Sequence, residues 1–344
     1  MTTATFAGPL RAGNTRAVLL VTALLALSAV VIAGGLTVGT KTLSPAQALS
    51  ALIHPDGKLD SILVWTLRLP RSLAAFAGGA GLAVSGYLLQ TLTRNPLAGP
   101  GLTGVSAGAV APIVACFVFL PALSSIYYPI IGLIGGLGAA SATFWIARGG
   151  NARPLHLALA GISVSLFLGA ITTYILLLSG PQVPSLLFWL SGGFQGRSWP
   201  QLFQMLPWVI GGTLLALFSH RILQILSLSD QAAAGMGLNL AFWKPLLLLI
   251  AALPVAGVAP VAGPVAFVGL ATPHIVRLLR PGGPAAAIVL NVALGGLMTV
   301  SADLVARTVA LPKEIPVGIV TALIGGPIFV YLVQRRSLRF AGEA

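Results

Sequence analysis

The sequence predicts an all-α polytopic membrane protein, and its composition and charge pattern carry the prediction. Charged residues make up 7% of the 344 residues and hydrophobic residues 57%, whereas roughly a quarter of the residues in a typical soluble domain are charged. The mean hydropathy is +0.98. The charges lie between apolar runs that reach the roughly 20 residues needed to cross a bilayer. Little chain is left for a soluble domain.

Apolar intervals between charges locate the expected membrane spans in order along the chain. Five intervals are long enough for one span each: 17–40, 72–93, 198–220, 281–302 and 315–334. The interval 95–147 is long enough for two. The interval 154–196 holds one span and then a proline-bracketed segment that is too short to cross. We expect a short outer-face helix there, between spans 5 and 6.

The interval 245–276 decides the topology, because it is long for one helix and short for two. Proline and glycine interrupt it repeatedly over 253–269. Two short spans here give ten transmembrane helices with both termini cytoplasmic, and most basic residues then face the cytoplasm, as the positive-inside rule requires. The predicted organisation is a cytoplasmic tail over 1–16, a single ten-span domain over 17–334 and a cytoplasmic tail over 335–344.

Several functional classes are excluded by motifs that the sequence lacks. It has no G-x-x-x-x-G-K-[ST] for ATP and no metal-ligand spacing, so we expect no enzymatic activity, metal or cofactor in this chain. We assign the net charge of +13 to cytoplasmic loops rather than to nucleic-acid binding. Carboxylates are scarce: Asp303 is near the outer end of the ninth span, and Glu314 lies just beyond it. The chain therefore has few of the ionisable residues that a proton relay within the membrane needs, and a partner ATPase is the expected energy source.

Four ordered segments carry a resemblance to a known family. They are "RLPRSLAAFAGGAGLAVSGYLLQTLTRNPLAGPGLTGVSAGA" (68–109), "SDQAAAGMGLNLAFWKPLLLL" (229–249), "GPVAFVGLATPHIVRLL" (263–279) and "ADLVARTVALPKEIPVGIVTALIGGPIFVYLV" (302–333). Together they resemble the FecCD-type permeases for iron-siderophore, haem and vitamin B12 uptake. These permeases are the ten-helix membrane subunits of ABC importers.

The resemblance implies a set of partners and a cargo. It implies a second permease subunit, as homo- or heterodimer, two cytoplasmic ATP-binding subunits that use ATP and Mg, and a periplasmic or lipid-anchored substrate-binding protein. The chain would lie among the lipids of the bacterial cell inner membrane. "FWLSGGFQGRSW" (188–199) is more similar to ferric-siderophore permeases than to haem or vitamin B12 permeases. An ATP-independent secondary carrier is the alternative from another class.

Arg68 and Arg71 begin the second span on the outer face, where the positive-inside rule does not require them. From the residues alone they can anchor the helix by extending to lipid phosphates. The resemblance instead implies that they act with Arg307 in pairing with acidic residues of the binding protein, which sets docking register and encounter rate.

Three further segments have roles that the resemblance implies. Asn95 and Leu97 lie in an Asn-Pro turn and would act as a cytoplasmic gate. Ser229 or Asp230 can cap a short helix that Gly235 and Gly237 can end; with the small surface of Ala232 and Ala233 it would form the coupling loop for the ATPase. Phe194, Gln195 and Arg197 would border the entrance, although a helix over 185–199 anchored at the interface by Trp189 and Trp199 explains them equally well.

Overall fold

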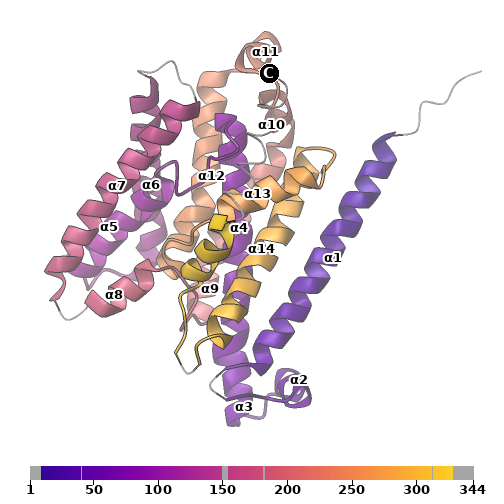
Figure 1. Cartoon of the computed structure of the whole chain (residues 1–344), viewed down its shortest axis with the longest axis vertical. Helices are drawn as coiled ribbons and strands as arrows, with labels where there is room; N and C mark the ends of the chain where they lie inside the picture. The colour runs from indigo at the N-terminus through magenta and orange to yellow at the C-terminus, as the bar shows by residue number, and fades with distance from the viewer. Residues whose placement is uncertain (1–8, 40, 149–153, 181–182, 312, 328–344) are drawn as a thin grey trace, which may run out of the picture.

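The computed structural model describes residues 9–39, 41–148, 154–180, 183–311 and 313–327, and every regular element in these ranges is helical. Seven helices are long and apolar enough to cross a membrane (Figure 1). They are α1 (Pro9–Thr37), α4 (Leu69–Thr93), α6 (Tyr128–Arg148), α7 (Pro154–Leu178), α9 (Trp199–Phe218), α12 (Leu240–Ala262) and α14 (Pro284–Thr308). The prediction of an all-helical membrane fold is confirmed.

Shorter helices complete the bundle and cover its ends. α5 (Val105–Phe119), α13 (Val268–Leu278) and a helix over Val317–Pro327 lie among the long helices. One end carries α2 (Pro45–Ile53), α3 (Leu59–Ile62), η1 (Leu63–Arg68), η2 (Ser125–Tyr127) and α8 (Val183–Leu190), and the opposite end carries α10 (His220–Leu226) and α11 (Asp230–Gly235) (Figure 1). We call these the α2 end and the α11 end.

α4 is the central helix of the bundle and packs against α9, α12, α13 and α14. Its sequence is rich in alanine and glycine, which lets neighbouring backbones approach closely. Gly79 lies against Gly295 of α14, and Gly86 lies against the carbonyl of Gly269 in α13, so a side chain at either glycine would collide with backbone atoms. Small residues on α4 therefore set its distance to two neighbouring helices.

The second predicted span begins earlier than the charge pattern indicates. Helical structure is continuous over Leu59–Thr93, because α3, the π-helix η1 and α4 follow one another directly. Arg68 and Arg71 consequently lie within a helix, with both side chains buried. α1 likewise begins at Pro9, inside the segment predicted as a tail.

The predicted breaks in 253–269 occur at only one place. α12 continues through Pro254 and Pro260 to Ala262, and the chain then turns at Gly263 and Phe267, which both have positive φ, before α13. Gly81 of α4 and Gly212 of α9 lie directly against Pro254. Close packing by neighbouring helices is the condition under which membrane helices tolerate proline.

The segment after α7 forms a shorter helix than predicted. α8 ends at Leu190, and Trp199 already belongs to α9. Trp189 is buried: its indole N–H donates to the carbonyl of Pro260, and its ring packs edge-on against Phe117. The prediction of an interfacial Trp189 is therefore wrong, because this side chain fills the space between α5 and α12.

Candidate functional site

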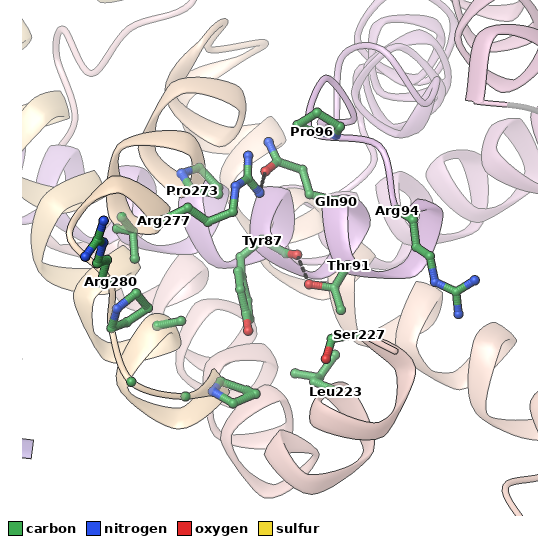
Figure 2. A pocket seen from close by; sticks show the side chains of 16 residues that line it. Tyr87, Gln90, Thr91, Arg94, Pro96, Leu223, Ser227, Pro273, Arg277 and Arg280 are labelled. Atoms are coloured by element: carbon green, nitrogen blue, oxygen red, sulfur yellow. Dashed lines mark hydrogen bonds between the residues drawn. The ribbon is translucent and has the colours of Figure 1, made fainter. Parts of the chain in front are cut away.

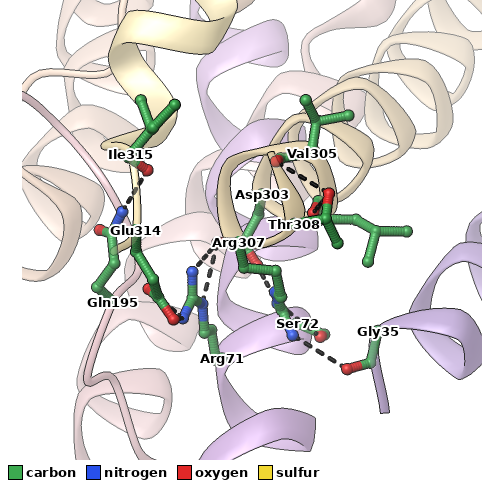
Figure 3. A network of polar contacts seen from close by, with 11 residues as sticks. Gly35, Arg71, Ser72, Gln195, Asp303, Val305, Arg307, Thr308, Glu314 and Ile315 are labelled. Carbon is green, nitrogen blue, oxygen red and sulfur yellow. Dashed lines mark hydrogen bonds and ion pairs between the residues drawn. The ribbon is translucent and has the colours of Figure 1, made fainter. Parts of the chain in front are cut away.

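Asp303 joins two of the predicted docking arginines at the α2 end (Figure 3). Its Oδ1 accepts from Arg71 Nε and Nη2 at 3.0 and 2.9 Å, and its Oδ2 accepts from Arg307. Glu314 Oε2 accepts from Arg71 Nη1 at 2.7 Å. Asp303 is completely buried, so its charge depends on these two arginines for compensation.

The arginines also bind the C-terminal end of α1. Arg307 Nη1 donates to the carbonyl of Gly35 at 3.1 Å, and Arg68 donates to the carbonyls of Leu36 (2.6 Å) and Lys41. The last carbonyls of a helix lack partners within the helix and carry partial negative charge, which favours cations nearby. The arginine cluster therefore attaches α1 to α4 and α14.

The structure brings all three predicted docking residues together, but in a buried position. Arg68, Arg71 and Arg307 are 6%, 8% and 3% exposed, and all three donate to groups of this chain. Glu314 is the accessible member, with 32% of its side chain exposed. The docking role itself stays a prediction.

Asp303 is the central residue that sequence reasoning did not assign to a site. It precedes Arg307 by one helical turn, and the two form an i, i+4 ion pair. This spacing places both side chains on one face of α14. The sequence feature that indicates this pair is an aspartate four residues before an arginine within a largely apolar span.

At the α11 end, the two predicted gate residues form a turn. Asn95 Oδ1 accepts from the backbone N–H of Leu97 at 2.9 Å, and Asn95 is buried. An asparagine that bonds the backbone two residues ahead is a standard turn element. The side chain thus fixes the turn that follows α4.

The predicted coupling loop forms the one-turn helix α11, and Ser229 caps it by accepting from the N–H of Ala232. Asp230 pairs with Arg94, which directly follows α4, and with Lys244 of α12. Burial raises the pKa of Asp230, but the hydrogen bonds and charges of Lys244 and Arg94 outweigh it and hold this pKa below its usual value. α11 is therefore bonded to two long helices.

The exposed surface of small residues that is expected on α11 is only partly present. Ala232 is exposed, as are Gly235 and Gly237, where the helix ends and the chain turns with a φ of +82° at Gly237. Ala233 is fully buried in a cluster that includes Leu223 and Leu226 of α10. The expectation that Ala233 lies on the surface is wrong, because it faces α10.

The three predicted entrance residues lie in the turn between α8 and α9. Phe194 is completely buried and lies against Gly78 of α4. Gln195 donates to the carbonyl of Ile315 at 2.9 Å. Arg197 is half-buried, and desolvation lowers its pKa. Phe194 and Gln195 thus hold this turn against α4 and the 313–316 segment.

Comparison with known proteins identifies the relatives of this chain. The model of the FecCD transport family matches residues 24–335. The Fe(3+)-citrate import system permease protein YfmD of Bacillus subtilis is 40% identical over 88% of this chain and 91% of its own length. The hemin transport system permease protein HmuU of Yersinia pestis is 34% identical over 90% and 92%. A solved metal-chelate type ABC transporter in an inward-facing conformation has a TM-score of 0.78 and 28% identity, covering 92% of this chain and 98% of that one.

Replacing Asp303 by asparagine tests its role at the α2 end. The change leaves Arg71 and Arg307 without their shared buried carboxylate, and breaking a buried ion pair in this way costs about 3–5 kcal/mol. We expect a large fall in the thermal unfolding midpoint of the purified protein in detergent. Asp60→Asn breaks the more accessible pair with Lys41, and such exposed pairs contribute less than about 1 kcal/mol. Equal stability of the two variants would contradict the role of Asp303.

Proposed function

The chain belongs to the FecCD transport family, and on this premise we propose that it is the transmembrane permease subunit of a binding-protein-dependent ABC importer. It moves an iron chelate, a ferric siderophore, into the cell by ATP-driven alternating access. The match over residues 24–335 carries the proposal. Permeases of ferric-citrate and hemin import systems are both among the relatives, which supports a metal chelate as cargo and leaves haem and vitamin B12 as alternatives.

The distribution of carboxylates supports an external energy source. Asp56 and Asp60 lie beside or in α3, Asp303 and Glu314 bond Arg71 at the start of α4, and Asp230 begins α11, so none of the carboxylates in the described ranges is in the middle of the bundle. A proton-coupled carrier normally has ionisable residues at that depth. We assign ATP and Mg to two partner subunits and no cofactor to this chain.

We further propose ten transmembrane helices, with the α11 end in the cytoplasm. The seven long helices are supplemented by α5, α13 and the helix over Val317–Pro327. The α11 end carries Arg221, Lys244, Arg277 and Arg280, and cytoplasmic loops are enriched in such residues. Both termini are then cytoplasmic, with 17–334 as one domain between tails over 1–16 and 335–344; α1 extends into the first tail from Pro9, and residues 1–8 and 328–344 are outside the described ranges.

The proposed partners contact different parts of this chain. The ATP-binding subunits dock on α11 and its flanking residues, and the substrate-binding protein docks at the α2 end around Arg68, Arg71 and Arg307. A second permease subunit, identical or not, completes the pathway, with Asn95 and Leu97 at its cytoplasmic gate. Phe194, Gln195 and Arg197 border the outer entrance. The whole assembly lies in the bacterial inner membrane.

Uptake by the reconstituted protein tests the energy source. Proteoliposomes with the ATP-binding subunits and the binding protein should take up the ferric chelate only with internal ATP, and vanadate should abolish uptake. Proteoliposomes with this chain alone should show none. Vanadate-insensitive uptake by the chain alone would support a secondary carrier. Binding affinities of the binding protein for ferric siderophore, haem and vitamin B12 identify the cargo.

A tryptophan scan of α11 separates docking from folding. Ala232→Trp adds bulk to the exposed face and should weaken co-purification of the ATP-binding subunits by roughly tenfold, with an unchanged unfolding midpoint. Ala233→Trp places the same ring in a filled core and should lower the midpoint by overpacking. Full transport and normal co-purification by Ala232→Trp would contradict the assignment of α11.

Glu314→Gln tests docking at the α2 end while leaving the buried bond from Arg71 to Asp303 intact. Removing the accessible carboxylate frees one side of Arg71 for an acidic partner and should strengthen binding of the substrate-binding protein about two- to fivefold at low salt. Asp56→Asn removes a carboxylate whose ion pair is with exposed Lys58 and whose Oδ1 also accepts from Ser61; it lies outside the arginine cluster and measures the general effect of charge. Equal affinities of the two variants would exclude Arg71 as a contact.

A further inference from the structure

A basic cavity lies at the α11 end, and its lining residues do not include the predicted gate and coupling residues. It has a volume of about 740 Å³ and lies between the end of α4, α10 and the connection from α13 to α14 (Figure 2). This volume is within the roughly 300–1,000 Å³ of typical ligand sites. Arg94, Arg277 and Arg280 line it together with Gln90 and Tyr87, and its lining contains no carboxylate.

The positive charge of the cavity is only partly compensated. Arg94 pairs with Asp230 beyond the lining, and Arg277 donates to the side-chain oxygen of Gln90. Arg280 is exposed, and its guanidinium has no acceptor within hydrogen-bond distance among the described residues. In Figure 2, Arg94 and Arg280 lie on opposite sides of the cavity, with Arg277 and Gln90 between them. An anion in this space would therefore have cationic groups around it.

Backbone conformation gives independent support for a role of these side chains. Arg94 follows α4 with a φ of +49°, and Arg280 follows α13 with a φ of +53°. Glycine is the usual residue in this left-handed conformation after a helix. Within the described ranges, three non-glycine residues have a positive φ: Arg94, Arg280 and Phe267. Two of the three are thus arginines that line the same cavity. Strain of this kind is typical of functional positions.

The cavity also has an apolar wall that continues along the membrane-facing side. Tyr87, Val276 and Ala287 line the cavity and pack in one cluster with Leu20 and Leu24 of α1. On α1, Val18 and Leu19 are exposed beside this cluster. The surface thus offers positive charge at the end of the bundle and apolar side chains next to it, which suits an anion with a hydrocarbon tail.

We propose that this cavity binds the phosphate headgroup of an anionic phospholipid of the cytoplasmic leaflet. Arg280 and Arg277 contact the phosphate, and the acyl chains lie along α1 and α14. The leaflet assignment rests on the proposed orientation. Basic pockets between membrane helices at the cytoplasmic side are suited to such headgroups. The apolar wall favours a lipid over free phosphate or an acidic protein segment.

Lipid retention by the purified full-length chain tests the proposal. Native mass spectrometry in detergent, with added phosphatidylglycerol or phosphatidylcholine, should show selective retention of phosphatidylglycerol. Arg280→Asn removes the charge, and asparagine tolerates the left-handed conformation. Arg277→Gln removes the second charge. Each change should weaken retention about fivefold, whereas Arg221→Gln, at an exposed arginine of α10 outside the cavity, should leave it unchanged.

Three results would overturn the proposal. The first is unchanged phosphatidylglycerol retention by the Arg277→Gln, Arg280→Asn double variant with a normal unfolding midpoint. The second is complete displacement by inorganic phosphate at a concentration equal to that of the lipid, which would indicate a free-anion site. The third is loss of ATP-binding-subunit co-purification in Arg280→Asn with lipid retention intact, which would indicate a protein contact. Because the lipid assay contains neither cargo nor ATP, its failure is distinguishable from failure of the transport function.

Discussion

The buried carboxylate of Asp303 is the interaction on which the α2 end depends. Two arginines in a low-dielectric interior repel each other and lose their hydration, and a shared carboxylate offsets both effects. With Arg71 and Arg307 held in this way, Arg307 can also bond the end of α1. Three helices that are distant in sequence are thereby fixed at one point. α1 otherwise packs against α14 on one side, and only 6% of its most apolar window is buried.

With the proposed orientation, this arrangement explains why the arginines of the α2 end do not follow the positive-inside rule. The positive-inside rule concerns basic residues that remain exposed in loops. Arg71 and Arg307 are instead compensated by Asp303 and Glu314. A docking partner with acidic residues would then meet a cluster that is already paired, and Glu314 is the only carboxylate of this cluster with substantial exposure. On docking, a carboxylate of the partner would replace Glu314 as the acceptor for Arg71. The strength of docking would therefore depend on Glu314.

The sequence was sufficient to locate the helices, because apolar runs between charges mark membrane spans whatever their packing. It was insufficient where a residue departed from the usual behaviour of its type. The charge pattern places the limit of a span at Arg68 and Arg71, yet both lie inside a continuous helix. Pro254 predicts a break, yet Gly81 and Gly212 leave room for it in the packed bundle. The orientation of α11 toward α10, which buries Ala233, depends on tertiary contacts that a six-residue segment does not reveal.

α4 is the physical link between the two ends of the molecule. At its start, Arg71 is bonded to Asp303 and Glu314, and just beyond its end Arg94 is bonded to the carbonyl of Leu226 and to Asp230 of α11. Most of the helix between these points is buried against α12, α13 and α14 with backbone-to-backbone contacts at glycine. A closely packed helix transmits displacement because interiors are poorly compressible. A shift of α11 imposed by a partner ATPase would therefore reach the arginine cluster through α4.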